Sequence, residues 1–191
     1  MEAGSERSKN TRPTTALVVI DVQVDVVANA HDRAGVLERI NVLVDRARSV
    51  NAPVIWVQDH GDGLPLNTPG WELAPELHPR DDETLIHKVH GDAFEATTFE
   101  EELAAADVGT LVVAGAQTEF CIRATIHGAF SRGYNTILVG DAHTTDDLSA
   151  HGLPTPDLVI AHTNMYWRNQ TAPGRRAAVL NTPDIAFQTS D

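Results

Sequence analysis

The sequence predicts an α/β fold of three layers, in which a six-stranded parallel sheet carries helices on both faces. Two observations support this prediction. Short runs such as residues 15–21 and 110–115 are apolar at successive positions, as strands buried on both faces of a parallel sheet are. Between such runs lie stretches whose apolar residues recur every three or four positions, which is the spacing of a helix with one buried face. Strands that alternate with helices form parallel sheets between helical layers.

The first half of the chain follows this alternation. The strand predicted over residues 15–21 contains β-branched residues and ends in a carboxylate. In residues 33–51 the apolar positions recur at helical spacing, while charged residues occupy the other face. A second strand is expected over residues 54–58, directly after Pro53. Residues 60–82 are rich in Gly and Pro with little periodicity, which predicts a long loop of the kind that is often functional.

The second half repeats the pattern. A short strand is expected over residues 84–87, and a longer buried strand over residues 110–115. From Thr118 onward the apolar residues return to helical spacing, and Gly133 is placed to end that helix. The same patterns predict helices over residues 98–106 and 155–167 and strands over residues 135–139 and 177–180.

Composition narrows the possible partners and location. Fourteen Lys and Arg against 27 Asp and Glu give a formal charge of -13, which opposes binding to nucleic acid. No window has the roughly 18 uninterrupted apolar residues of a membrane-spanning helix, and the N-terminus lacks the apolar core of a secretory signal. We therefore expect a cytoplasmic protein without a membrane partner. Residues 1–13 are polar and predicted to form a flexible tail, and residues 14–191 one domain.

Three reactive side chains are predicted to meet at one edge of the sheet. Asp21 ends the first strand, Lys88 follows the third, and Cys121 lies in the first helical turn after the fourth. In an open parallel sheet the positions just past the carboxyl ends of the strands face the crevice in which ligands bind. A carboxylate, an amine and a thiol would thus share a small-molecule site.

The surroundings of Cys121 suggest a nucleophile. Thr118 is a suitable N-cap, so the thiol would face the positive end of a helix, and together with Lys88 this favours the thiolate. Asp21 could act as general base and then general acid, and backbone N–H groups between Gly115 and Cys121 could hold an oxyanion. These parts describe acyl transfer through a covalent thioester.

Each residue also has a structural interpretation. A lone cysteine such as Cys121 is commonly a small buried apolar side chain. A carboxylate at a strand end, like that of Asp21, often caps backbone amides, and a lysine such as Lys88 is normally a solvated charge. The common placement of the three at strand ends is what favours the catalytic interpretation.

Three motifs resemble a known family. The segments TALVVIDVQVDVV, KVHGDAFEATTFEEEL and VVAGAQTEFCIRATIHGAFSRGYNTILVGDAHTT are similar to those of the isochorismatase-like cysteine hydrolases, a group related to nicotinamidase and N-carbamoylsarcosine amidase. The resemblance runs over residues 15–178. It implies a six-stranded parallel sheet flanked by helices and the catalytic residues Asp21, Lys88 and Cys121.

The resemblance also implies details of the site. A cis peptide bond is implied between Ala116 and Gln117, with the amides of Gln117 and Cys121 forming the oxyanion hole. Phe94 matches an aromatic position that lines the pocket in relatives, and Trp71 lies in a loop that could cover the pocket; both could equally be core or subunit-contact residues. The Gln117 side chain could read a polar substrate group or point to solvent.

A metal is not expected at this site. Nicotinamidase-like members hold one through an Asp and two His, and Asp59 with His60 invites the comparison. Adjacent residues of an extended strand point in opposite directions, however, so the two would not share a metal. His78, His87 and His90 could supply further nitrogen ligands, but the expectation is no metal and no other cofactor.

The predicted function is hydrolysis of an amide or carbamoyl C–N bond in a small molecule, because the resemblance implies that amide-cleaving members keep the cysteine, Cys121 here. Two alternatives remain: an isochorismatase-type vinyl ether hydrolase in which Asp21 is the acid, and a binding protein that has lost turnover. A flavin binder of flavodoxin type is disfavoured, since residues 22–32 lack a phosphate-binding glycine. The resemblance implies a homodimer or homotetramer, and we expect residues 60–82 and the C-terminal segment to form the contact surface.

Overall fold

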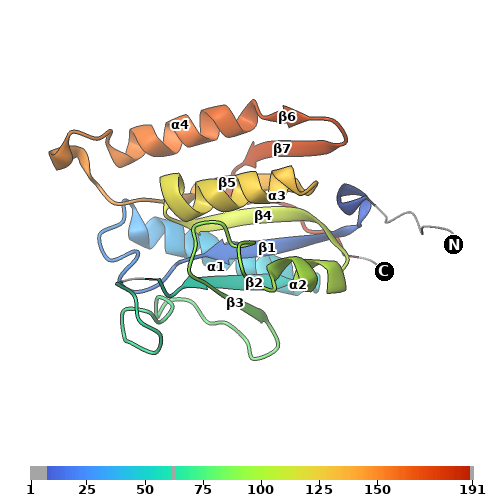
Figure 1. Cartoon of the computed structure of the whole chain (residues 1–191), viewed down its shortest axis with the longest axis horizontal. Helices are drawn as coiled ribbons and strands as arrows, with labels where there is room; N and C mark the ends of the chain where they lie inside the picture. Colours follow the sequence, from blue (N-terminus) through green and yellow to red (C-terminus); the bar gives the residue numbers. More distant parts are fainter. Residues whose placement is uncertain (1–7, 62, 190–191) are drawn as a thin grey trace, which may run out of the picture.

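The protein, represented here by a computed structural model that describes residues 8–61 and 63–189, is built around one mostly parallel sheet. The order of its strands is β3-β2-β1-β4-β5-β7-β6 (Figure 1). Six of them run parallel, as expected from their apolar runs. The strands are β1 (Thr14–Ile20), β2 (Val54–Asp59), β3 (Thr84–Lys88), β4 (Val108–Ala116), β5 (Asn135–Thr144), β6 (Thr171–Ala172) and β7 (Arg175–Leu180).

The predicted strand count was one too low. The seventh strand, β6, has only two residues and pairs antiparallel with β7 at the edge of the sheet. Two residues are too few to form a periodic pattern, so this strand could not be predicted from apolar spacing. The strand β5 is also longer than predicted, because its pairing with β4 is interrupted by an irregularity between Val113 and Gly115 and then resumes.

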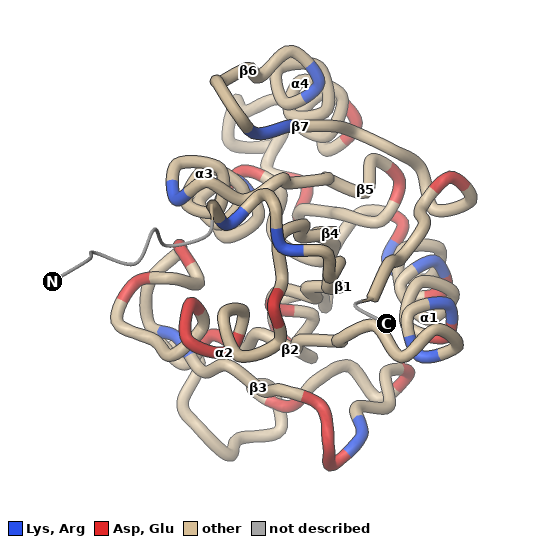
Figure 2. Tube along the Cα trace, turned by 90° about the vertical axis from the view of Figure 1, so that its right-hand side faces the viewer, with Lys and Arg blue, Asp and Glu red and all other residues tan. Residues whose placement is uncertain are grey.

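Helices cover both faces of the sheet. The helices are α1 (Arg33–Ser49), α2 (Phe99–Ala105), α3 (Arg123–Ser131) and α4 (Pro156–Arg168). Seen along the strands, α1 lies on one side of the sheet and α2 and α3 on the other (Figure 2). Within residues 8–61 and 63–189 there are also three short 3-10 helices, at Lys9–Thr11, Ser149–His151 and Thr182–Asp184.

Each face of the sheet has its own apolar core. Leu37, Ile40 and Leu43 of α1 pack on one face. On the other face Phe99 of α2 and Ile126 of α3 share a second core with Trp167, which brings α4 onto the same side. Since β1 contributes alternate residues to the two cores, all seven of its residues are buried. The central strand of the sheet is therefore closed to solvent on both faces.

The structure differs from the prediction at the N-terminus. Lys9–Thr11 form a 3-10 helix, and the Lys9 ammonium pairs with the carboxylate of Glu100, so the later residues of the predicted tail pack against the domain. The first seven residues of that predicted tail lie outside the described residues.

The helix predicted from Thr118 begins differently than expected. Its first turn is a π-helix, η2 (Thr118–Ile122), and regular α-helix starts only at Arg123. Such wide turns are rare and are frequent at functional sites. Cys121 lies within this turn.

Among the described residues, none of the helices is long and apolar enough to cross a membrane. The loop predicted over residues 60–82 contacts the core in its second half: Gln23 and Leu73 form an isolated antiparallel β-bridge, and Ala74 and Leu77 are buried in the core beside α1. Residues 73–77 are therefore held next to the segment that follows β1.

Candidate active site

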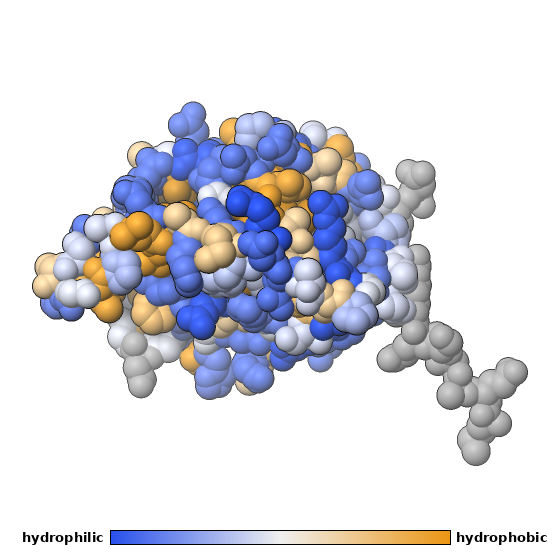
Figure 3. All heavy atoms as spheres, turned by 90° about the horizontal axis from the view of Figure 1, so that it is seen from above, coloured by the Kyte–Doolittle hydropathy of each residue, from blue (hydrophilic) through white to orange (hydrophobic). Residues whose placement is uncertain are grey.

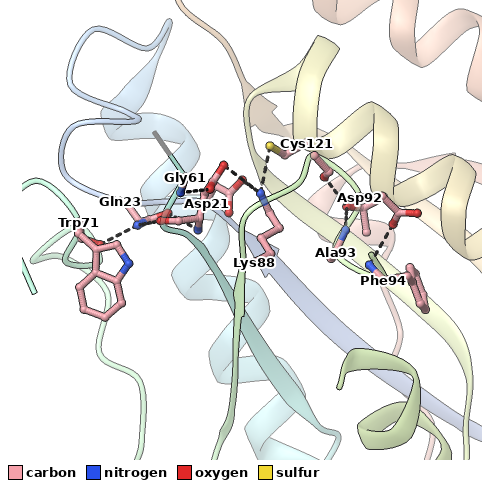
Figure 4. Close-up of polar contacts among 12 residues, drawn as sticks. Asp21, Gln23, Gly61, Trp71, Lys88, Asp92, Ala93, Phe94 and Cys121 are labelled. Carbon is pink, nitrogen blue, oxygen red and sulfur yellow. Dashed lines mark hydrogen bonds and ion pairs between the residues drawn. The ribbon is translucent and has the colours of Figure 1, made fainter. Parts of the chain in front are cut away.

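Three reactive side chains meet at the carboxyl ends of the strands. The Lys88 ammonium nitrogen lies 2.8 Å from Oδ2 of Asp21 and 3.2 Å from Sγ of Cys121 (Figure 4). Both distances are within hydrogen-bonding range for the atoms concerned. The residues come from positions 21, 88 and 121 of the chain, and the sheet brings them into direct contact.

Strand register explains why they meet. β1 lies between β2 and β4, with Ile20 opposite Val57 on one side and Gly115 on the other, so Asp21 leaves the sheet between its two neighbours. On the far side of β2, Asp59 is opposite Lys88. Asp21 itself adopts a left-handed backbone conformation with φ of 51°, which is uncommon for a residue with a side chain and clusters at functional sites.

The close approach of β1 and β4 depends on a glycine. Gly115 has φ of 123°, and a Cβ there would lie 2.1 Å from the carbonyl oxygen of Ile20. Only glycine fits both the backbone angle and the available space. One residue further on, the peptide bond between Ala116 and Gln117 is cis and leads directly into η2.

The carboxylate of Asp59 also belongs to this group, although the sequence suggested for Asp59 only the role of a metal ligand. Oδ2 of Asp59 lies 3.3 Å from the Lys88 nitrogen, and its Oδ1 accepts a 2.8 Å hydrogen bond from the Gly61 N–H. The signal that could have found it is its position at the end of β2, one strand from Asp21.

The backbone of Asp59 is held by a buried amide. The Gln23 side chain accepts from the Asp59 N–H at 2.8 Å and donates to the Asp59 carbonyl at 2.9 Å. Its amide also donates to the Trp71 carbonyl at 2.7 Å, which links the loop to the same place. Gln23 is fully buried, so this double contact fixes the end of β2 relative to β1.

The residues differ in access to solvent. The side chains of Asp21 and Lys88 are 2% and 0% exposed, that of Asp59 is 28% exposed, and Cys121 is partly exposed. A pocket of about 460 Å³ lies at the carboxyl ends of β2 and β3, and its lining includes His60, Gly61, Val89 and His90. These lining residues directly follow Asp59 and Lys88 in the chain, so the pocket lies beside the reactive group.

Burial and neighbouring charges set the ionisation of the site. Burial raises the pKa of Asp21 to about 6, although Lys88 and a hydrogen bond with Cys121 act to lower it. Burial alone would lower the pKa of Lys88, but the Asp21 carboxylate and Cys121 outweigh it and the pKa lies above its usual value. At neutral pH the pair is therefore a carboxylate and an ammonium.

The expectation of a preformed thiolate was wrong. Burial and the Asp21 carboxylate raise the pKa of Cys121 to about 12, against the lowering effect of Lys88. The expected N-cap is also absent, because the Thr118 hydroxyl lies 2.8 Å from Nδ1 of His143 instead of bonding to Cys121. The resting sulfur is a thiol whose proton faces a carboxylate with a pKa near 6.

Gln117 and Phe94, which were also predicted to line the pocket, both contact other parts of the protein. The Gln117 side chain donates to the Val26 carbonyl at 3.2 Å, so its amide is engaged within the protein. The ring of Phe94 is buried in the core against Phe99 and Tyr134 and points away from the sulfur (Figure 4). The Arg132 guanidinium lies 4.6 Å from the centre of the same ring, and the predicted role of Phe94 in the pocket stays a prediction.

Trp71 lies in the loop as expected, and the centre of its ring is 5.4 Å from the centre of the His87 ring. His87 and Lys88 are adjacent on β3, so their side chains point to opposite faces of the sheet. The backbone carbonyl of Trp71 is the part that faces Gln23. Trp71 therefore anchors the loop, and the structure gives no contact between its ring and the three reactive residues.

The histidines do not gather around Asp59. The His60 ring lies near the ring of His87, with centroids 6.2 Å apart. Within the described part of the chain, one group of three side chains has metal-ligand spacing, namely Asp21, Asp59 and Cys121, whose ligand atoms lie within 4.8 Å of one another. The Lys88 ammonium contacts all three of these side chains. A divalent cation bound by them would therefore lie next to a positive charge and be repelled by it.

Comparison with known proteins agrees with this architecture. Residues 15–153 match the isochorismatase domain family. A streptothricin hydrolase of Streptomyces noursei is 36% identical over 145 residues, which cover 73% of this chain; the chain spans only 58% of that relative's length. The ureidoacrylate amidohydrolase RutB of Methylobacterium radiotolerans is 28% identical over 220 residues, covering 93% of this chain and 84% of the relative. Among solved structures, a protein described as belonging to the isochorismatase family superposes with a TM-score of 0.77 at 29% identity, covering 92% of this chain and all of that one.

Proposed function

The chain belongs to the isochorismatase family of hydrolases, and from this premise we propose that it is a cysteine hydrolase that cleaves an amide or carbamoyl C–N bond of a small molecule through a thioester. The observation that carries the proposal is the buried Lys88 ammonium in contact with both the Asp21 carboxylate and the Cys121 sulfur. The names of two relatives, streptothricin hydrolase and ureidoacrylate amidohydrolase, support hydrolysis and, for the second, an amide bond.

In the first step the Cys121 sulfur attacks the carbonyl carbon as its proton passes to Asp21. Because the pKa of the free thiol is raised to about 12, this transfer accompanies attack and does not precede it. The Lys88 ammonium, 3.2 Å from the sulfur, stabilises the negative charge that develops. The backbone amides of Gln117 and Cys121 receive the carbonyl oxygen at the start of η2.

In the second step the tetrahedral intermediate collapses. The C–N bond breaks, and the leaving nitrogen takes the proton held by Asp21, which leaves a thioester on Cys121 and a carboxylate on Asp21. Water then attacks the thioester carbon while the same carboxylate removes its proton, and Asp21 passes this proton to the sulfur as the C–S bond breaks. An amide gives a carboxylic acid and an amine or ammonia, a carbamoyl compound gives a carbamic acid and an amine or ammonia, and the thiol is restored.

The test is a panel of primary amides and carbamoyl compounds assayed beside isochorismate. We expect C–N cleavage by the wild-type chain, and loss of activity by about 10³-fold or more in Cys121→Ala. Cys121→Ser keeps the shape of the side chain with a poorer nucleophile and serves as the matched control for folding. Full amide turnover by Cys121→Ala would overturn the proposal, and release of pyruvate from isochorismate by both proteins would support the vinyl ether alternative.

A further inference from the structure

We propose that Asp59 selects substrates with a positively charged group close to the scissile carbonyl. This inference rests on the proposed function, because it names the class of substrate for the same site. It follows from a count of charges at the site, from the exposure of Asp59, and from the way the protein holds that carboxylate.

The site contains more negative than positive charge. Asp21 and Asp59 are two carboxylates, Lys88 supplies one ammonium, and Cys121 is a neutral thiol at rest. Within the described residues, Lys88 is the ion-pair partner of both carboxylates. The set therefore has one net negative charge, and it lies partly out of water, where charges interact more strongly than in solution. A cationic group on the substrate would complete the pairing.

Asp59 is the carboxylate that a substrate can reach. Its contact with Lys88, at 3.3 Å, is longer than the 2.8 Å contact between Lys88 and Asp21, and its side chain is 28% exposed against 2% for Asp21. Among the described residues, the only other hydrogen bond to its side chain comes from the Gly61 N–H. A carboxylate offers about four acceptor positions, so Asp59 retains capacity to accept from a ligand.

The carboxylate is also fixed before any ligand binds. Gln23 holds the backbone of Asp59 through two hydrogen bonds, and the Gly61 N–H orients the side chain. A group held in this way loses little freedom on binding and so discriminates well between ligands. An exposed acidic residue without a role would not need such support from a buried amide.

Distance limits where the charge can lie. The reactive atoms of Asp21, Asp59 and Cys121 are within 4.8 Å of one another. A substrate carbonyl bonded to the sulfur would therefore have its cationic atom about two to four bonds from the carbonyl carbon, given bond lengths of about 1.5 Å. An amide with a carboxylate at the same position would be rejected, since like charges at this separation repel.

The experiment compares amides of matched size. Glycinamide and β-alaninamide carry an ammonium two and three bonds from the carbonyl carbon, propionamide and butyramide are their neutral counterparts, and malonamate and succinamate are anionic. For the wild-type chain we expect kcat/KM to be at least about tenfold higher for the cationic amide than for its neutral counterpart, and lowest for the anionic one. In Asp59→Asn the ratio of kcat/KM for the cationic amide to kcat/KM for its neutral counterpart should fall by about tenfold, whatever common change the loss of the contact with Lys88 brings to both amides.

Controls separate recognition from structure. The control variant Glu38→Gln removes an exposed charge on α1, the helix that covers one face of the sheet. It should leave the preference for cationic over neutral amides unchanged. If Asp59 only positioned Lys88, Asp59→Asn would lower kcat for all amides equally, and an unchanged ratio of cationic to neutral substrates would overturn the inference. If the wild-type chain cleaves none of the amides, the proposed function fails. Calorimetry with Cys121→Ala then decides the inference, since glycinamide must bind more tightly than propionamide and lose that advantage when Asp59→Asn is added.

Discussion

Lys88 carries a charge that its position would ordinarily oppose. The ammonium is fully buried, and burial alone lowers the pKa of a lysine. Here the Asp21 carboxylate and the sulfur of Cys121 reverse that effect, with Asp59 adding to it. The consequence is a division of roles: the ammonium stays charged, Asp21 can change protonation near pH 6, and Cys121 stays a thiol until a substrate arrives.

Replacing Asp21 should have opposite effects on two measurements, the rate of turnover and the rate at which Cys121 is alkylated. Asp21→Asn should lower turnover by about 10³-fold, because it removes the base. The same change should increase the rate at which iodoacetamide alkylates Cys121 at pH 7, since the carboxylate that raises the pKa of the thiol is gone while Lys88 remains. Asn also tolerates the left-handed backbone found at this position. Peptide mass spectrometry measures the alkylation, and slower labelling of the variant would contradict the electrostatic account.

The pH dependence follows from the same carboxylate. Asp21 must be ionised to accept the thiol proton, and its pKa is raised to about 6 by burial. We expect kcat/KM to fall tenfold per pH unit below about pH 6 and to level off above it. A profile that stays flat down to pH 4 would mean that the group titrates at its ordinary value and is not the base.

Sequence reasoning predicted the residues better than their charge states. Asp21, Lys88 and Cys121 were predicted to share a site because each follows a strand, and the sheet register brings them into contact. The thiolate was predicted wrongly, because the effect of burial on Cys121 depends on packing that no local motif encodes. Asp59 was considered for a metal only, since its proximity to Lys88 depends on the pairing of β2 with β3.

At the level of elements, the turn that contains Cys121 is held by a buried histidine. His143, on β5, donates from Nε2 to the Asn164 side-chain oxygen at 3.0 Å, so its Nδ1 is left to accept from the Thr118 hydroxyl at 2.8 Å. Asn164 belongs to α4 and in turn donates to the Gly140 carbonyl. These contacts link η2 to β5 and α4 through Thr118, which lies three residues before Cys121.

Acid should weaken this link. Burial lowers the pKa of His143 to about 4, against an ordinary value of 6.5. A lowered pKa means that the unfolded chain takes up the proton first, so stability falls as the pH drops from 6.5 towards 4. Between pH 7 and pH 5 the contribution is about 2 kcal/mol. Asp21, whose pKa is raised, contributes with the opposite sign, so the comparison needs a variant.

The variant is His143→Gln, which keeps one donor and one acceptor but does not titrate. Urea unfolding at pH 7 and pH 5 should show that the wild-type chain loses about 2 kcal/mol more than the variant over this interval. Equal losses in the two proteins would show that His143 is not the titrating group.

The elements themselves were largely predictable. The six parallel strands and the four α-helices follow from apolar periodicity, which reports burial directly. What periodicity could not provide was the π-helical start of η2 and the two-residue strand β6, because both depend on contacts with distant residues and leave no repeating pattern.

For the whole molecule, the dominant property is its negative charge. A formal charge of -13 attracts cations over distances that depend on salt, because the Debye length falls from about 30 Å at 0.01 M to about 8 Å at 0.15 M ionic strength. We therefore expect kcat/KM for glycinamide to fall severalfold when sodium chloride rises from about 10 to about 200 mM. Propionamide, measured in parallel, should show no change, and an equal effect on both amides would exclude electrostatic attraction.

The assembly state stays a prediction. Figure 3, which views the molecule from the side of α4, shows apolar atoms among the polar ones on this face, and Leu153, Leu158 and Met165 are each at least half exposed. Apolar patches of this kind often mark contact surfaces between proteins. Light scattering would check the expected homodimer or homotetramer, and a monomeric mass would contradict it.

The central claim is that the Cys121 sulfur becomes bonded to the acyl part of the substrate. Acid quenching of the wild-type chain within milliseconds of mixing with a turned-over amide, followed by peptide mass spectrometry, tests this directly. The account predicts that the peptide containing Cys121 gains the mass of the acyl group and that hydroxylamine removes it, with no such gain in Cys121→Ala. Turnover with no acylated peptide, together with incorporation of solvent oxygen into the product by Cys121→Ala, would contradict it.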